Sequence, residues 1–139
     1  MTIAFIPKLF LDEIPLFIVP DSISFDEGSA ALVSQVITHG SQRKVTQTPD
    51  YTNSRGSVQF QIIVNASDNE QENPMLLFNK YKQKAISGVG SVIKILPETG
   101  VGGLIFTNML LINTLNGSFG INAPISFNFE GNSAVILTS

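Results

Sequence analysis

Apolar and polar residues alternate along much of this chain, which is the pattern of a half-buried β-strand. In residues 58–64 the alternate positions are large and apolar, with Gln59 and Gln61 between them. Residues 125–130 alternate in the same way. Other stretches rich in Val, Ile, Leu and Phe end at Gly, Pro, Asn or Asp and predict strands. These stretches are 15–19, 22–26, 31–38, 91–96, 104–113 and 134–138.

One segment, about 73–87, departs from this period and predicts a single helix. Asn73 can cap it with a side-chain oxygen, Pro74 suits the first turn, and Gly88 suits the stop. An apolar stripe at helical spacing would lie on a sheet. The stripe consists of Leu77, Phe78, Tyr81 and Ala85. The sequence therefore predicts a mainly β protein, an antiparallel β-sandwich or barrel-like fold with one flanking α-helix.

A long polar stretch, about 39–57, separates two apolar strands. Its sizeable apolar residues are Val45 and Tyr51, and it holds both arginines of the chain, Arg43 and Arg55. A polar excursion of this length is usually functional or disordered. We interpret it as a contact loop, with a mobile tip as the alternative, and part of it can form an extended hairpin. The apolar N-terminal extension, about 1–14, is expected to form a strand or to pack on a neighbouring subunit.

The composition indicates a single domain, 1–139, that assembles with others. The chain has 139 residues and only 14% charged residues, against roughly 25% in ordinary soluble domains. Its mean hydropathy is +0.24. Apolar surface that charges cannot break up usually marks assembly contacts. The net charge of −3 argues against non-specific binding to nucleic acid. No apolar run is long enough to predict a membrane span.

Candidate chemistry is sparse. His39 is the only histidine, and no motif places a nucleophile or carboxylate beside it. The glycine-rich run at 100–103 lacks the Lys-Ser/Thr of a phosphate loop, and 68–72 lacks the glycine of a calcium loop. Asp12 and Glu13, read as neighbours in a strand, would point to opposite faces. The sequence thus predicts no enzyme, no metal site and no cofactor.

Four short motifs occur in a defined order along the chain. They are Gly56-Ser-Val-Gln-Phe, Glu72-Asn73-Pro at the helix start, Phe106-Thr-Asn108, and Phe129-Glu-Gly131-Asn-Ser-Ala134. From about residue 30 to 135 this order resembles the tail tube protein of contractile-tailed bacteriophages. Tubes of phage-tail-like bacteriocins and of type VI secretion are related to that family.

This resemblance implies a structural subunit that forms hexameric rings, which stack into the hollow inner tail tube. DNA would pass through the lumen without specific binding on its way from the virion into the host. The implied partners are further copies of the chain, a surrounding sheath protein, and baseplate and tail terminator proteins, with no membrane insertion. The subunit would assemble in the bacterial cytoplasm and reside in the virion tail. Alternatives are a tube initiator or baseplate hub component of the same fold, and a ligand-binding β-sandwich module.

Two groups of residues are the candidate sites. Contacts between subunits or rings are assigned to the polar stretch, because guanidinium groups can pair with a neighbour's carboxylates. These residues are Arg43, Lys44, Asp50, Tyr51 and Arg55, with Asp50 and Tyr51 expected at the loop tip. The lumen should be polar and poor in lysine and arginine, and the alternative is a face exposed to bulk solvent. The candidates are Gln59, Gln61, Ser126, Asn128 and Glu130.

Overall fold

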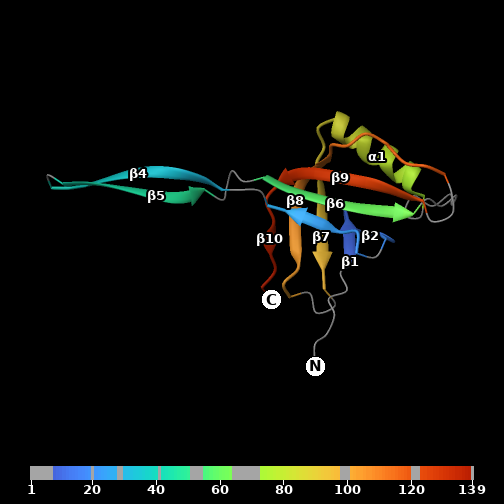
Figure 1. The fold of residues 1–139 in the computed structure, drawn as a ribbon, viewed down its shortest axis with the longest axis horizontal. Helices are drawn as coiled ribbons and strands as arrows, with labels where there is room; N and C mark the ends of the chain where they lie inside the picture. Colours follow the sequence, from blue (N-terminus) through green and yellow to red (C-terminus); the bar gives the residue numbers. More distant parts are fainter. Residues whose placement is uncertain are drawn as a thin grey trace, which may run out of the picture.

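The computed structural model describes residues 8–19, 21–27, 30–40, 42–50, 55–63, 73–97, 101–119 and 123–138. Within these ranges the chain forms ten strands and one helix, and all strand pairings are antiparallel (Figure 1). The elements are β1 (Lys8–Leu11), β2 (Ile14–Pro15), β3 (Ser24–Asp26), β4 (Ala31–His39), β5 (Gln42–Asp50), β6 (Arg55–Ile63), α1 (Pro74–Ile86), β7 (Ser91–Leu96), β8 (Leu104–Leu111), β9 (Pro124–Asn132) and β10 (Val135–Ile136). The predicted class, mainly antiparallel β with one flanking helix, is confirmed.

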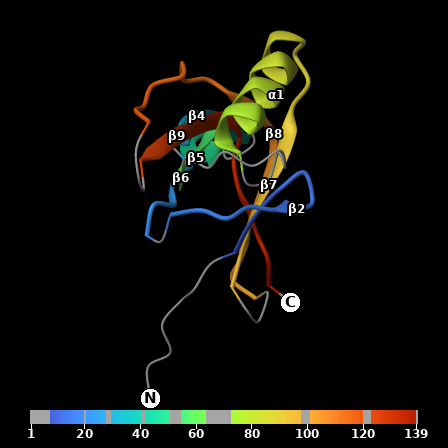
Figure 2. The ribbon, with the colours of Figure 1, turned by 90° about the vertical axis from the view of Figure 1, so that its right-hand side faces the viewer.

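Eight of the strands belong to one sheet, in the order β2-β1-β7-β8-β9-β6-β3, with β10 paired to β8 beside this path. β6 and β9 run along the long axis of the molecule, whereas β7 and β8 run across it (Figure 1). One half of the sheet contains β7 with β1 and β2, and the other contains β9 with β6 and β3 (Figure 2). β8 pairs with β7 in one half and with β9 in the other, so it joins them around the core.

β8 bends at a β-bulge near Asn108. Ser91 of β7 lies opposite Met109, but Ile93 lies opposite Phe106, so β8 carries one extra residue between these pairs. Asn108 has a φ of +54°, in the left-handed region that asparagine tolerates better than most residues. The bulge therefore turns β8 from one half of the sheet into the other.

Two glycines make room for this bend. A Cβ on Gly90 would come within 2.7 Å of the Cα of Asn108, and one on Gly131 within 2.8 Å of its carbonyl carbon. Both distances are shorter than a Cβ contact allows. The absent side chains let the neighbouring strands close on the bulge, which gives a physical role to the Asn108 and Gly131 positions of the sequence motifs.

The core lies between the two halves of the sheet and α1. The alternation predicted for β6 and β9 is confirmed, since the apolar residues of their inner face are at most 2% exposed, whereas Ile63 on the other face is 37% exposed. Val64, the last position of the predicted pattern in 58–64, lies outside the described residues. The Phe60 ring stacks on Phe127 and Phe129, with centroid distances of 5.2 Å and 5.9 Å. The buried residues of these strands are Val58, Phe60, Ile62, Ile125, Phe127 and Phe129.

The helix begins and ends as its sequence predicts. Asn73 Oδ1 accepts a hydrogen bond from the Met75 N–H at 3.0 Å, and Pro74 occupies the first turn. After the helix, Gly88 has a φ of +73°, and its N–H and that of Val89 donate to the last turn of the helix, as in a Schellman motif.

The predicted apolar stripe of α1 faces the sheet. Leu77, Phe78 and Tyr81 are buried, and Ala85 packs against the same core. The Phe78 ring lies 5.4 Å from Phe127, and the Tyr81 ring meets Phe129 edge-on at 5.9 Å. The helix is thus anchored to β9 by aromatic contacts.

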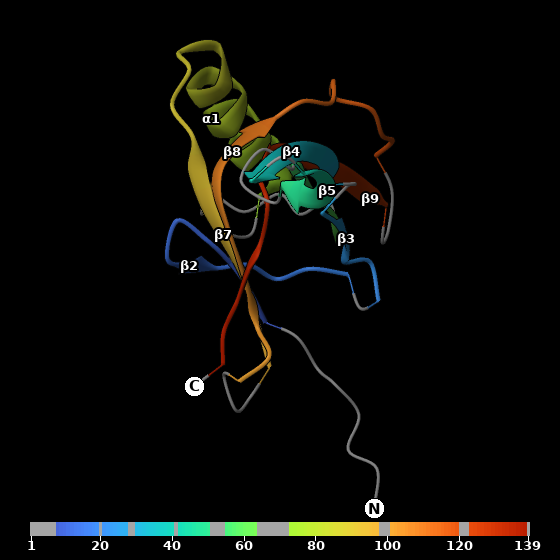
Figure 3. The same ribbon diagram turned by 90° about the vertical axis from the view of Figure 1, so that its left-hand side faces the viewer.

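β4 and β5 form a separate two-stranded hairpin that projects from the body (Figure 1). Viewed along the long axis, the hairpin is seen end-on in front of the sheet (Figure 3). Within the polar stretch 39–57, residues 42–50 and 55–57 are strand, and 51–54 lie outside the described residues. The described part of this stretch is therefore an extended hairpin rather than an irregular loop.

One predicted strand, 15–19, is wrong beyond its first residue. β2 ends at Pro15, and the chain then crosses from one half of the sheet to the other. The Leu16 N–H donates to Leu9 at 3.0 Å, whereas the Val19 N–H donates to Gln61 at 2.8 Å. Because the segment bonds to a different strand at each end, it pairs continuously with neither.

Candidate assembly surfaces

The five residues predicted to line a lumen lie together on one face of β6 and β9. The register pairs Gln59 with Asn128, and Gln61 with Ser126, directly across the two strands. Glu130 lies opposite Ser57 on the same face. This face is opposite the aromatic core, and β3, β6 and β9 contain no lysine.

Side-chain contacts order this face. Gln61 Nε2 donates to Ser126 Oγ at 3.3 Å, and the Arg55 Nε lies 3.3 Å from Glu130 Oε1. Gln59 and Ser126 are exposed, while Gln61, Asn128 and Glu130 are half-buried. Arg55, the arginine of these strands, thus already faces a carboxylate of its own subunit. We call this polar surface of β6 and β9 the glutamine face.

The residues predicted to contact neighbours do not cluster at one tip. Arg43 lies on β5 opposite Thr38, close to the turn at Gly40, and its side chain is exposed. Asp50 is the last residue of β5, so the expectation that it lies at the tip is wrong, because the tip is the turn between β4 and β5. Lys44 also lies on β5. Tyr51 is outside the described residues.

The hairpin carries exposed apolar side chains on both of its faces. The register puts Leu32 and Val45 on one face, together with Arg43, and Val33 on the other. Leu32 is 64% exposed and Val45 is 62% exposed. Of the β4 and β5 residues whose burial the structure describes, none belongs to the buried core. An isolated two-stranded hairpin is only marginally stable in water.

Asp12 ties three elements together in a way the sequence did not suggest. It forms with Glu13 the two-residue turn between β1 and β2, where both have positive φ. Its carboxylate accepts hydrogen bonds from the Lys84 Nζ at 2.7 Å, the Val92 N–H at 2.9 Å and the Tyr81 hydroxyl at 3.1 Å. Burial opposes ionisation, but these donors outweigh it and hold the pKa of Asp12 below its usual value. The two residues are therefore a turn and not a strand.

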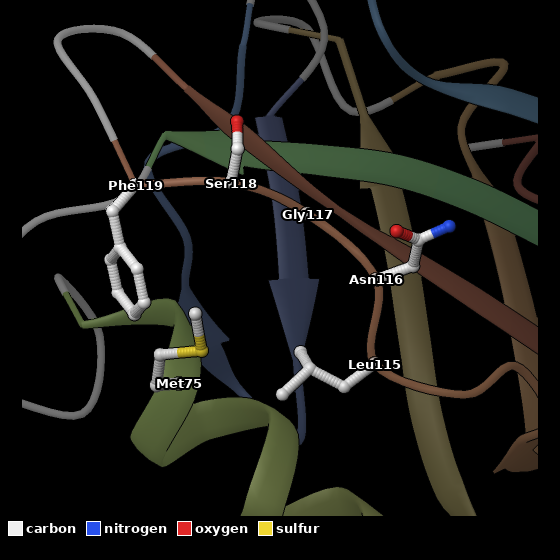
Figure 4. Close-up of a pocket in the computed structure, with 6 residues that line it drawn as sticks. All are labelled: Met75, Leu115, Asn116, Gly117, Ser118 and Phe119. Carbon is white, nitrogen blue, oxygen red and sulfur yellow. The ribbon is translucent and has the colours of Figure 1, made fainter.

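A shallow apolar pocket of about 350 Å³ lies between the start of α1 and the segment that follows β8. The side chains of Met75, Leu115 and Phe119 surround it, whereas the polar ends of Asn116 and Ser118 point away (Figure 4). Ligand sites usually combine apolar walls with a few convergent polar groups. Among the described residues that line the pocket, the side chains turned toward it are apolar.

The described ranges contain no cluster of three or more His, Cys, Asp or Glu side chains able to hold a metal ion. No helix within them is long and apolar enough to cross a membrane.

The structure thus has an antiparallel β fold with a projecting hairpin and a polar face on β6 and β9. No protein-family model matches this chain, and neither does the sequence of any curated protein. Among solved structures, it is similar to a chain of the "Virion of native gene transfer agent (GTA) particle". That match has a TM-score of 0.51 and 12% identity, and covers 94% of this chain and 95% of that one.

A second similar chain comes from the "Tail of empty GTA particle computed with helical refinement, C6 symmetry". Its TM-score is 0.45 at 12% identity, with 84% of this chain and 78% of that chain covered. The first likeness, which spans nearly the full length of both chains, shows that this protein shares the fold of a chain in a gene transfer agent virion.

Proposed function

We propose that this chain is a structural subunit that assembles into hexameric rings, and that the rings stack into the hollow inner tail tube of a phage-like particle. The observation that carries the proposal is the hairpin β4–β5, which projects from the body and exposes Leu32, Val33 and Val45. A hairpin of this kind gains a core only from another subunit.

The exposed apolar side chains of the hairpin support assembly as well. Leu32 is 64% exposed and Val45 is 62% exposed. The shared fold with a virion chain is consistent with the tail tube resemblance of the sequence motifs. The sheath, baseplate and terminator partners, and a location in the virion tail, follow from that resemblance and belong to the proposal.

The glutamine face is our candidate for the wall of the lumen. It presents amide and hydroxyl groups from Gln59, Gln61 and Ser126, and its arginine is paired with Glu130. Neutral polar groups can contact passing DNA without the phosphate attraction that lysines would add. A wall of this composition would therefore let DNA slide without holding it.

The hairpin is our candidate for contacts between stacked rings. Arg43 near its turn would pair with carboxylates of a neighbouring subunit, since a guanidinium can bond a carboxylate at two points. Asp50, at the base of the hairpin, and Arg55, at the start of β6, lie nearer the body and would contribute to contacts there.

Light scattering on size-exclusion fractions tests the assembly. We expect masses at multiples of six subunits as protein concentration rises, since assembly would give the hairpin and the sheet edges partners in other copies. A protein that stays monomeric at every concentration and salt condition would contradict the proposal.

A further inference from the structure

The chain contains a single Asn-Gly dipeptide, Asn116-Gly117, which lies in the irregular segment that follows β8. Both residues are exposed, and the Asn116 side chain points away from the neighbouring pocket (Figure 4). Asparagine is thermolabile, because its side-chain carbonyl carbon can react with the backbone nitrogen of the next residue. Glycine at that next position favours the reaction, since it has no side chain to hinder the approach. The dipeptide is therefore a candidate site of chemical modification.

Hydrogen bonds leave this dipeptide free to react. Within the part of the chain that the structure describes, neither the Asn116 amide nor the Gly117 N–H has a hydrogen-bond partner. Asn113, in the same segment, differs in this respect. Its Nδ2 donates to the Ser126 carbonyl at 2.9 Å, and its Oδ1 accepts from the Asn128 N–H at 3.0 Å. The Asn113 side chain is thus fixed to β9, whereas that of Asn116 can rotate toward the following nitrogen.

We propose that Asn116 is a site of spontaneous deamidation. The Gly117 nitrogen loses its proton and attacks Cγ of Asn116, so that an N–Cγ bond forms, the Cγ–Nδ2 bond breaks, and the leaving nitrogen takes up a proton as ammonia. Water then opens the resulting succinimide at either of its carbonyl carbons, which gives aspartate or isoaspartate. Each product carries a carboxylate that is ionised at neutral pH, so the net charge of the subunit changes from −3 to −4.

The isoaspartate product would also disturb packing, because Gly117 holds the segment against the core. A Cβ at Gly117 would overlap the side chain of Ile125 and lie 3.4 Å from the Pro124 carbonyl oxygen. Ile125 is fully buried in β9. In isoaspartate the main chain runs through Cβ and is one methylene longer, which would displace Gly117 from this close approach. Isoaspartate would therefore loosen the segment from Ile125, whereas aspartate would add only charge.

Ageing of the purified protein at neutral and mildly alkaline pH tests the site. Ion-exchange chromatography separates the more acidic products, and fragmentation of peptides in a mass spectrometer locates the change and distinguishes aspartate from isoaspartate. Asn116→Gln is the matched control, because glutamine keeps the amide but would have to form a larger and less favourable ring. Asn113 is an internal control in the same sample, and the urea-unfolded chain gives the rate without the fold.

We expect Asn116 to convert at least five-fold faster than Asn113 in the native protein, at a rate that rises with pH. Asn116→Gln should form no acidic product at this position. Conversion at Asn116 no faster than at Asn113 would overturn the proposal. So would native protein that stays unmodified while the unfolded chain converts, because the fold would then protect Asn116. The test uses unassembled protein, so its outcome is separate from that of the tube proposal.

Urea unfolding of the separated products tests the effect on packing. Asn116→Asp carries the added charge without the added methylene, and we expect it to unfold at the same urea concentration as the unmodified protein. The isoaspartate fraction should unfold at a lower concentration than Asn116→Asp. Equal midpoints for the two would overturn the loosening of the segment and leave the deamidation site standing.

Discussion

Asp12 shows how one residue can hold several elements in place. Its carboxylate bonds to Lys84 of the helix, to the backbone of β7, and to the Tyr81 hydroxyl, while its own turn joins β1 to β2. Its side chain is 28% exposed, so these bonds are partly shielded from water. Hydrogen bonds to a charged group contribute about 1.5–3 kcal/mol.

We expect Asp12→Asn to lower the free energy of unfolding by about 1–3 kcal/mol at neutral pH. Asparagine keeps the turn because it also tolerates positive φ. The folded-state pKa of Asp12 lies below the ordinary value of 3.8, so its stabilisation is complete above that value. The stabilisation is lost as the pH falls through the lowered pKa, and the two proteins should then converge.

Urea unfolding of dilute protein at neutral and acidic pH measures this difference. Glu13→Gln is the matched control, because Glu13 belongs to the same turn and pairs with Lys94, but is 74% exposed. An exposed ion pair contributes only about 0–1 kcal/mol. A loss for Asp12→Asn no larger than for Glu13→Gln would refute the role given to Asp12.

Gln59 tests the assignment of the glutamine face to the lumen. We expect Gln59→Lys to assemble normally but to slow DNA passage, most strongly at low ionic strength. Each additional phosphate contact makes the slope of the log binding constant against log salt concentration steeper by about 0.9. Rates of DNA release from particles that carry the variant, measured across a salt series, give the answer.

Gln83→Lys is the matched control for this substitution. Gln83 is also exposed but lies on α1, away from the β6–β9 face. We expect it to leave DNA passage unchanged. Equal kinetics for the two variants at every salt concentration, with normal tubes, would place Gln59 outside the lumen.

At the scale of elements, the hairpin can be shortened without touching the core. The register pairs Val33 with Thr48, so replacing residues 34–47 with Asn-Gly keeps this pair and closes it with a two-residue turn. We expect the subunit to fold, because no hairpin residue whose burial the structure describes belongs to the core. We expect it no longer to elongate, because the proposed contacts of the hairpin are removed.

Circular dichroism with light scattering separates folding from elongation in this variant. Deletion of residues 47–54 is a poorer test, because it would remove the last four of the nine residues of β5 and disturb the register. Normal elongation of the shortened protein would show that the hairpin is not an assembly element.

The bulge in β8 allows a second test at the scale of elements. We expect Gly131→Ala to lower the free energy of unfolding by about 1–3 kcal/mol, because its Cβ would overlap the carbonyl of Asn108. The neighbouring Asn132→Ala, at an exposed position, should change stability by about 0.5 kcal/mol or less. Similar unfolding curves for both variants would mean that β8 shifts freely around the bulge.

Local patterns predicted the elements whose stability is local. The alternation in β6 and β9 and the caps of α1 follow from residues a few positions apart, such as Asn73 and Gly88. The segment 15–19 could not be predicted in this way, because Leu16 and Val19 bond to strands that are distant in sequence. The role of Asp12 depends on α1 and β7, about 70 and 80 residues away, which only the assembled fold brings to it.

The same distinction between local patterns and tertiary contacts applies to the candidate surfaces. Alternation alone put Gln59 and Gln61 on one face, and the register of β6 with β9 then brought Ser126, Asn128 and Glu130 beside them. The pairing of Arg55 with Glu130 and the pocket at Phe119 depend on tertiary contacts. No spacing along the chain indicates either of them.

At the scale of the whole molecule, the account depends on surface that one subunit cannot cover. The chain has few charges, a projecting hairpin at one end, a pocket at the other, and a polar face between. Stacked rings would bury the two ends and leave the polar face in the lumen. A monomer that stays soluble and does not assemble at high concentration is the opposite of what these features predict.

Electron microscopy of the purified, concentrated protein tests this central claim most directly. The account predicts hollow tubes of stacked rings with six subunits in end-on views, and shortened-hairpin protein that yields no tubes. Images that show only single subunits at every concentration and salt condition, or closed assemblies without a lumen, would contradict it.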